Sequence, residues 1–214
     1  MDHRTKEALR YLGYGRNPGE ERTLELIRQS FEELEGLQEE RIVWRREPVT
    51  VREPDQVETA GMDIRSRGLA RNLKGCLEVI LVAATLGTRT DLLLRRYSRT
   101  DMTRAVILQA CAAARLEEYL DAWQEERKKE LEEEGLYLRP RFSPGYGDFS
   151  IHHQKALLQR LEASKRIGLT MTDGYMLTPS KSVTALAGIS LEETACHRQG
   201  CESCGKIDCA YRRE

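Results

Sequence analysis

The sequence predicts an α+β protein with a meandering, mainly antiparallel sheet and flanking helices. Three observations support this class. Apolar residues recur at helical spacing in long segments, β-branched runs of strand length stand between those segments, and helices and strands do not alternate as they do in parallel βαβ proteins. The chain has 214 residues, 40% of them hydrophobic, which is enough to bury a core without disulfides or structural metals.

The first 40 residues predict a helical segment. Apolar residues recur every three or four positions over 24–37, and Asn17 is the expected N-cap of that helix. The next segment, 41–52, is rich in β-branched residues and alternates in part. It predicts one or two strands at an exposed edge of the sheet, broken at Pro48.

The middle of the chain predicts a central strand between helices. A short helix over 66–74 precedes the apolar run 77–87, which has the length and composition of a buried strand. A short helix over 88–97 follows, and then a long helix from an N-cap at Asp101 to about Glu134. The expected buried stripe of the long helix is Met102, Ala105 or Val106, Ala110, Ala113, Leu116, Leu120 and Trp123.

The last third predicts an extended segment, a turn, a helix and two strands. Residues 137–142 are extended and 143–147, rich in glycine and proline, form the turn. A helix is expected over about 150–165, followed by strands over 169–176 and 182–189.

Charge and hydropathy exclude two classes of partner. The formal net charge of −1 lacks the excess of Lys and Arg that binding to nucleic acid requires. No apolar run approaches the length of a membrane span, and the N-terminus has no apolar signal core, so a cytoplasmic location without a membrane partner is expected. Common nucleotide-binding and hydrolase motifs are absent from the sequence.

The cysteines are unevenly distributed. Since a cytoplasmic chain keeps its thiols reduced, the six cysteines are expected to be thiols or metal ligands, and Cys76 and Cys111 to be small buried side chains. Residues 191–214 form a cysteine-rich tail that could wrap one zinc ion or an iron–sulfur cluster. A loose redox-active tail is the alternative. The four predicted ligands, at spacings x4, x2 and x4, are Cys196, Cys201, Cys204 and Cys209.

A second candidate site is the segment 139–147, Arg-Pro-Arg-Phe-Ser-Pro-Gly-Tyr-Gly. Its prolines fix the path of the backbone, and Gly145 permits a close approach to a ligand. Arg141 offers a planar fork suited to a carboxylate or a phosphate, and Tyr146 a flat face with a polar tip. Taken alone, the pattern also fits an ordinary loop.

The segment belongs to an ordered series of short motifs. In chain order they are Arg141-x-x-Pro144-Gly145-Tyr146, His152-His153-Gln154-Lys155, Ile167-Gly168-Leu169, Met171-Thr172-Asp173 and Pro179-x-x-Ser182-Val183. In order and spacing this series resembles the activation (AdoMet-binding) domain of cobalamin-dependent methionine synthase. The stretch from Leu73 to Gly87 and the helix through Glu117 resemble the free-standing members of that family. The resemblance covers about residues 60–190.

This resemblance implies a fold and a function. The activation-domain-like part would occupy 41–190 and bind S-adenosylmethionine (AdoMet) at the edge of its sheet. In that family, AdoMet re-methylates a corrinoid in the inactive cob(II)alamin state once an electron is supplied. Because the cobalamin is carried by other domains in the family, the chain would be a stand-alone reactivation factor. Its partner would be a cobalamin-binding methionine synthase subunit or another corrinoid protein.

The resemblance also implies the residues of the site. Arg141 would hold the carboxylate of AdoMet, and Glu117 would offset the positive charges of the ligand, with Glu118 as the fallback. The backbone of 143–145 would contact the adenine or ribose, with Tyr146 packing beside it. A plain surface carboxylate is the alternative for Glu117. The implied ligand-binding residues are Glu117, Arg141, Ser143, Pro144, Gly145 and Tyr146.

Two further functions stay open at this point. One is a non-catalytic adaptor for a corrinoid protein, with a structural metal in its tail. The other is an iron–sulfur redox partner of a corrinoid enzyme. Larger family members have a late tyrosine near the methyl donor, for which this sequence has no position after Val183. The sequence therefore leaves open whether the chain itself supports methyl transfer.

Overall fold

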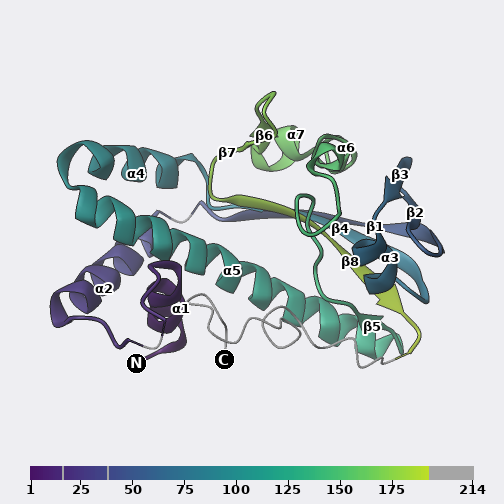
Figure 1. Cartoon of the computed structure of the whole chain (residues 1–214), viewed down its shortest axis with the longest axis horizontal. Coiled ribbons are helices and arrows are strands. Elements are labelled where there is room, and N and C mark those ends of the chain that lie inside the picture. The colour runs from purple at the N-terminus through teal and green to yellow at the C-terminus, as the bar shows by residue number, and fades with distance from the viewer. Residues whose placement is uncertain (16, 38, 193–214) are drawn as a thin grey trace.

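An antiparallel sheet forms the centre of the computed structural model, which describes residues 1–15, 17–37 and 39–192 (Figure 1). The strands are β1 (Arg41–Arg52), β2 (Gln56–Thr59), β3 (Met62–Arg65), β4 (Cys76–Thr85), β5 (Tyr137–Leu138), β6 (Thr170–Met171), β7 (Leu177–Thr178) and β8 (Ser182–Ser190). Within the described residues, six strands pair in the order β3-β2-β1-β4-β8-β5, while β6 and β7 form a separate hairpin. All these pairs are antiparallel, which confirms the predicted class.

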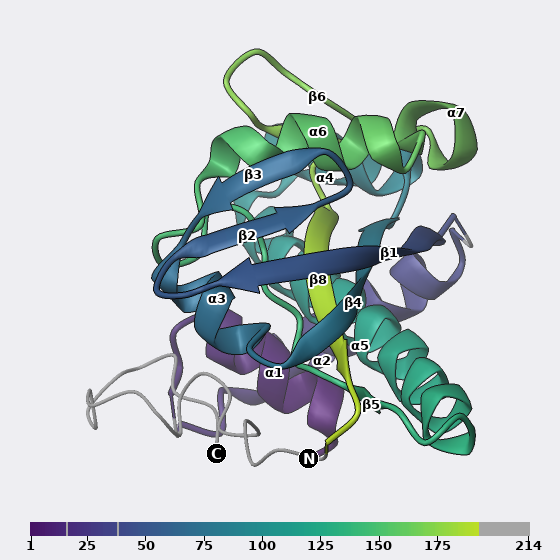
Figure 2. The same cartoon turned by 90° about the vertical axis from the view of Figure 1, so that its right-hand side faces the viewer.

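Helices cover both faces of the sheet (Figures 1 and 2). They are α1 (His3–Tyr11), α2 (Glu21–Glu35), α3 (Arg67–Asn72), α4 (Thr88–Thr100), α5 (Met102–Glu133), the 3-10 turn η1 (Ile151–His153), α6 (Gln154–Arg160) and α7 (Ala163–Ile167). The apolar residues of α1, α2 and α5 form one cluster with one face of β4 and β8. Those of α3, α6 and α7 form a second cluster on the opposite face.

β4 is buried on both sides, as a central strand between two helical layers must be. Its even-numbered residues 80–84 belong to the cluster with α1, α2 and α5, whereas its odd-numbered residues 79–83 belong to the cluster with α3, α6 and α7. Successive side chains of a strand point to opposite faces, so such a strand needs apolar residues at every position. This explains the uninterrupted apolar run and confirms the predicted central strand.

The prediction of edge strands broken at Pro48 was wrong. β1 is one continuous strand that lies between β4 and β2. It pairs with β4 as far as Pro48 and with β2 from Val49 onwards, so the proline stands where the strand changes partners. A residue without an N–H is tolerated there because the ladder with β4 ends at that point. Figure 2 shows β2 and β3 turned steeply relative to β4 and β8, with β1 between them.

The N-terminal helix begins later than predicted. α2 starts at Glu21, and Asn17 instead accepts a hydrogen bond from the N–H of Gly19 at 3.1 Å, closing a turn ahead of the helix. α1 lies inside the predicted helical segment but was not recognised as a separate helix. The β2–β3 hairpin was also missed, because strands of four residues carry little periodic signal.

The C-terminal third is more interrupted than predicted. The helix expected over 150–165 is divided into η1, α6 and α7, with a break at Glu162, whose φ is +50°. Of the strand expected over 169–176, only Thr170–Met171 is a strand, β6. The rest forms the turn of the β6–β7 hairpin, in which Tyr175 also has a positive φ. β8 matches the prediction for 182–189.

α5 confirms the predicted long helix and its cap, but only part of its buried stripe. Asp101 accepts a hydrogen bond from the N–H of Arg104 at 3.0 Å, as an N-cap does. Met102 is 64% exposed, so this assignment was wrong. Of the pair Ala105 or Val106, Ala105 is buried and Val106 is 52% exposed. Ile107 and Leu108 are buried as well, so the covered face of the first half of α5 is wider than predicted.

The two described cysteines are part of the core. Cys76 and Cys111 are buried in opposite apolar clusters, and neither forms a disulfide. Burial raises the pKa of the Cys111 thiol to about 12, so this group stays neutral at physiological pH. The prediction of small buried side chains is confirmed.

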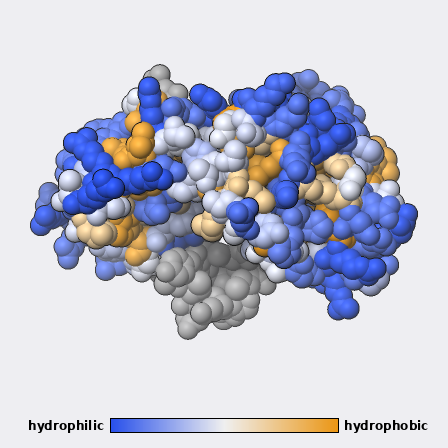
Figure 3. Space-filling model, turned by 90° about the horizontal axis from the view of Figure 1, so that it is seen from above, coloured by the Kyte–Doolittle hydropathy of each residue, from blue (hydrophilic) through white to orange (hydrophobic). Residues whose placement is uncertain are grey.

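The surface seen in Figure 3 is mostly hydrophilic, and its apolar patches are small and separated. None of the helices in the described residues combines the length and apolar character needed to cross a lipid bilayer.

Candidate ligand site between the Pro-Gly-Tyr turn and the long helix

The segment that carries Arg141 is held against the outer edge of β8. The N–H of Arg139 donates to the carbonyl of Gly188 at 2.7 Å, and Phe142 exchanges two backbone hydrogen bonds of 2.8 and 2.9 Å with Leu186. A Cβ at Gly188 would lie 2.6 Å from the Sγ of Cys76, so a glycine is needed for this close packing. These contacts bring the chain from β5 to the side of α5.

Arg141 points onto one face of α5 rather than into solvent. Its side chain is 15% exposed. Nη1 donates to Oε1 of Gln124 at 2.8 Å, and Nη2 donates to Oδ1 of Asp121 at 2.6 Å and to Oε2 of Glu117 at 3.3 Å. The three acceptors are spaced by four and three residues, so they share one face of the helix. The structure therefore brings the predicted pair Arg141 and Glu117 together.

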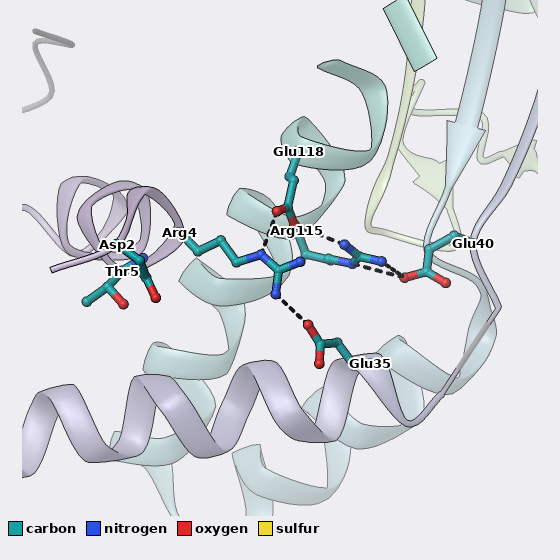
Figure 4. Close-up of polar contacts among 7 residues, drawn as sticks. All are labelled: Asp2, Arg4, Thr5, Glu35, Glu40, Arg115 and Glu118. Carbon is teal, nitrogen blue, oxygen red and sulfur yellow. Dashed lines mark hydrogen bonds and ion pairs between the residues drawn. The ribbon is translucent and has the colours of Figure 1, made fainter. Parts of the chain in front are cut away.

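The fallback residue, Glu118, points toward Arg4 and Arg115 rather than toward Arg141 (Figure 4). Its carboxylate accepts hydrogen bonds from Nε of Arg4 at 2.5 Å and from Nη1 of Arg115 at 2.9 Å. Arg4 also pairs with Glu35, and Arg115 with Glu40. Burial would raise the pKa of Glu118, but the hydrogen bonds from these two arginines outweigh it, and the pKa is lowered. Glu118 thus ties α5 to α1, while Glu117 faces the candidate site.

The Pro-Gly-Tyr turn is shaped by short backbone contacts. The N–H of Gly145 donates to the carbonyl of Phe149 at 2.7 Å, and the N–H of Tyr146 donates to that of Ser143 at 3.1 Å. Gly145 has a φ of +88°, which favours glycine. Pro144 is buried, whereas Tyr146 is 61% exposed with its ring edge-on to Phe142. The turn therefore presents Gly145 and the ring of Tyr146 to solvent.

Asp148 anchors the far end of this turn, and sequence analysis missed it. Its carboxylate accepts hydrogen bonds from Oγ of Ser66 at 2.6 Å and from the N–H groups of Arg67 at 2.7 Å and Gly68 at 3.1 Å. The hydrogen bond from Ser66, followed by those from the backbone, lowers the pKa of Asp148. The turn is thereby fixed to the start of α3 as well as to β8.

Asp121 and Gln124 were also missed, although a signal for them existed. They follow Glu117 at the four- and seven-residue positions of the same helix face, so the assignment of Glu117 to the site could have been extended to them. Gln124 is 8% exposed and Asp121 has a side chain that is 55% exposed. One acceptor of Arg141 is thus buried and neutral, and another is accessible and charged.

Comparison with known proteins shows which family this chain resembles. The family model described as "Vitamin B12 dependent methionine synthase, activation domain" matches residues 78–193, more than half of the chain. The chain belongs to this family. The matched range contains most of β4 and all of α5, the Pro-Gly-Tyr turn and β8, which are the elements that position Arg141 and Glu117.

A structural relative supports the fold of this activation domain. A solved structure described as "Crystal Structure of the MetH Reactivation Domain bound to AdoHcy" matches with a TM-score of 0.61 and 16% sequence identity, covering 89% of this chain and 77% of that chain. At this level of identity the likeness concerns the fold, and it confirms the predicted activation-domain-like architecture. No protein with a curated function matches the chain.

The predicted metal ligands Cys196, Cys201, Cys204 and Cys209 lie outside the described residues. Over residues 1–15, 17–37 and 39–192, no group of three or more His, Cys, Asp or Glu side chains is placed to hold a metal ion. Metal binding by residues 191–214 stays a prediction.

Proposed function

We propose that this activation domain binds AdoMet beside Arg141 and supports reductive methylation of cob(II)alamin on a separate corrinoid protein or methionine synthase subunit. The observation that carries the proposal is the position of Arg141. The β8 edge and the Pro-Gly-Tyr turn hold it against an acidic face of α5, inside the matched range of the family. The relative named for a bound AdoHcy is consistent with a site for this class of ligand.

The charges of these residues suit the amino-acid end of AdoMet. A guanidinium can grip a carboxylate with two charge-assisted hydrogen bonds, which is the role proposed for Arg141. The carboxylate of Glu117 would balance the positive charges of the ligand. The backbone of 143–145 and the ring of Tyr146 would contact the adenosine.

The chemistry proposed for this complex is a methyl transfer to reduced cobalt. An external donor gives one electron to cob(II)alamin, which becomes cob(I)alamin. Its cobalt lone pair forms a bond to the methyl carbon of AdoMet while the carbon–sulfur bond breaks, and the electron pair stays on sulfur as AdoHcy leaves. No proton transfer is needed. The part of this chain is therefore to hold the methyl donor in a fixed orientation toward the corrinoid.

Calorimetry and spectroscopy test this proposal in two steps. We expect one equivalent of AdoMet or AdoHcy to bind to the purified chain. With a cobalamin-loaded methionine synthase subunit, a one-electron reductant and AdoMet, the visible spectrum of methylcobalamin should appear, and it should require the chain. Failure to bind either ligand would contradict the proposal. Binding to the corrinoid subunit without AdoMet binding would favour the adaptor function instead.

The cysteine spacing supports a second proposal, that residues 191–214 bind a metal. If the metal is an iron–sulfur cluster, it could supply the electron for reactivation, and the protein purified without oxygen should be brown and bleach on reduction. A colourless protein with one zinc per chain would instead favour a structural role. Protein with neither metal after anaerobic purification would rule out metal binding by this tail.

A further inference from the structure

The guanidinium of Arg141 is already held by groups of this chain. Asp121 and Glu117 both accept from Nη2, at 2.6 and 3.3 Å, and Gln124 accepts from Nη1 at 2.8 Å. No hydrogen bond joins Nε to another described residue. The nitrogen with the most acceptors is therefore Nη2.

Nη2 is also the nitrogen that a bound carboxylate needs. A guanidinium grips a carboxylate with two bonds along one of two edges, either Nε with Nη2 or Nη1 with Nη2. Both edges include Nη2. Nη2 already donates to both Asp121 and Glu117, so a bidentate ligand competes with these side chains for Nη2.

We propose that Asp121 is an internal competitor for the ligand's carboxylate and thereby a specificity-determining residue of the site. The inference rests on the proposed function and adds a residue and a step to it. Binding of a carboxylate exchanges one ion pair of Arg141 for another. The carboxylate of Asp121 leaves Nη2 and enters solvent, and the carboxylate of the ligand takes its place.

The geometry singles out Asp121 among the three acceptors. Its bond to Nη2 is the shortest, and its side chain is 55% exposed, so it can turn into water without being desolvated. Glu117 is less exposed, at 33%, and its bond is longer, so it competes less. Gln124 is buried and neutral, and it binds the other terminal nitrogen, which keeps Arg141 in position during the exchange.

The exchange also explains why such a site would prefer an amino-acid end over a simple carboxylate. Once released, Asp121 stands one helical turn from Glu117, and like charges at this spacing repel each other. A ligand that carries an ammonium next to its carboxylate offsets the charge of Glu117, which stays beside Arg141 while Asp121 turns into solvent. A ligand that carries only a carboxylate displaces Asp121 without this compensation.

The test measures the affinities of the wild type and of Asp121→Asn for two ligands. AdoHcy has the amino-acid end, and 5′-methylthioadenosine has the same adenosyl thioether without it. The asparagine keeps the shape but competes less for Nη2, since a neutral acceptor bonds a guanidinium more weakly than a carboxylate does. We expect AdoHcy to bind about two- to fivefold more tightly to the variant, the range of a partly exposed ion pair, and methylthioadenosine to be unchanged.

Glu125→Gln is the matched control. It removes one negative charge one turn further along α5, from a side chain of similar exposure that pairs with Lys128 and not with Arg141. Unchanged affinities in this variant would show that the gain is local. If Asp121→Asn binds AdoHcy equally or more weakly than the wild type, the competition is wrong. A parallel change for both ligands would indicate a structural effect and also overturn it. If neither wild type nor variant binds AdoHcy, the proposed function itself fails, and the inference fails with it.

Discussion

Replacement of Arg141 by alanine is expected to weaken AdoMet and AdoHcy binding by about 10- to 100-fold, the range for loss of hydrogen bonds between charged groups. The variant would lose the fork that grips the ligand's carboxylate. It would also leave Glu117 and Asp121 facing the site without the cation that now pairs with both of them. Isothermal titration calorimetry with AdoHcy measures the effect directly.

Arg141→Lys separates the bidentate geometry of the guanidinium from its positive charge, and Arg28→Ala is the control. Arg141→Lys keeps a positive charge but cannot form two parallel bonds, so an intermediate loss is expected. Arg28→Ala removes an exposed arginine of α2 that pairs with Glu25 and Glu32. The AdoHcy affinity of this variant should match that of the wild type. Wild-type affinity in Arg141→Ala, with the folded state verified by circular dichroism, would show that the ligand does not bind at this arginine.

Much of the fold could be predicted because burial leaves a direct trace in the pattern of apolar residues. β4 needs apolar side chains on both faces, and α5 needs a long stripe, so both were found with nearly correct bounds. The role of β1 could not be found in this way. Whether a strand with a proline lies at an edge or at a change of partners depends on β2, and the short β2 and β3 have too few residues to be recognised.

The candidate site could be predicted where a residue suited to the ligand also lies in a motif of the family. Arg141 and Glu117 came from a family resemblance, and the structure brings their side chains into contact. The choice between Glu117 and Glu118 needed the structure, because adjacent helix residues differ by about 100° in direction and the packing of α1 decides which face is covered. Asp148 was missed for a related reason: its partners, at the start of α3, are about 80 residues away in sequence.

The expected largest effect on stability comes from Leu120→Ala. Leu120 is fully buried in the cluster that joins α5 to α1, α2 and the sheet. Truncation of a buried leucine removes apolar contacts and leaves a cavity, which costs about 2–5 kcal/mol. Urea denaturation should show a lower midpoint and an unchanged m-value. Leu92→Ala on α4, where the side chain is 61% exposed, is the matched control and should change the free energy of unfolding by less than about 0.5 kcal/mol.

Leu120→Ala also tests whether packing of the core determines the geometry of the site. On α5 the buried stripe Leu116, Leu120 and Trp123 is displaced by one residue from the polar stripe Glu117, Asp121 and Gln124. One stripe fixes the helix to the core while the other faces Arg141, whose own position is set by β8 and α3. We therefore expect folded Leu120→Ala to bind AdoHcy with an affinity within about threefold of the wild type. The substitution removes apolar contacts in the core but no contact of Arg141. A loss as large as that of Arg141→Ala, measured in protein that is still folded, would show instead that packing against α1 and α2 holds the acidic face in place.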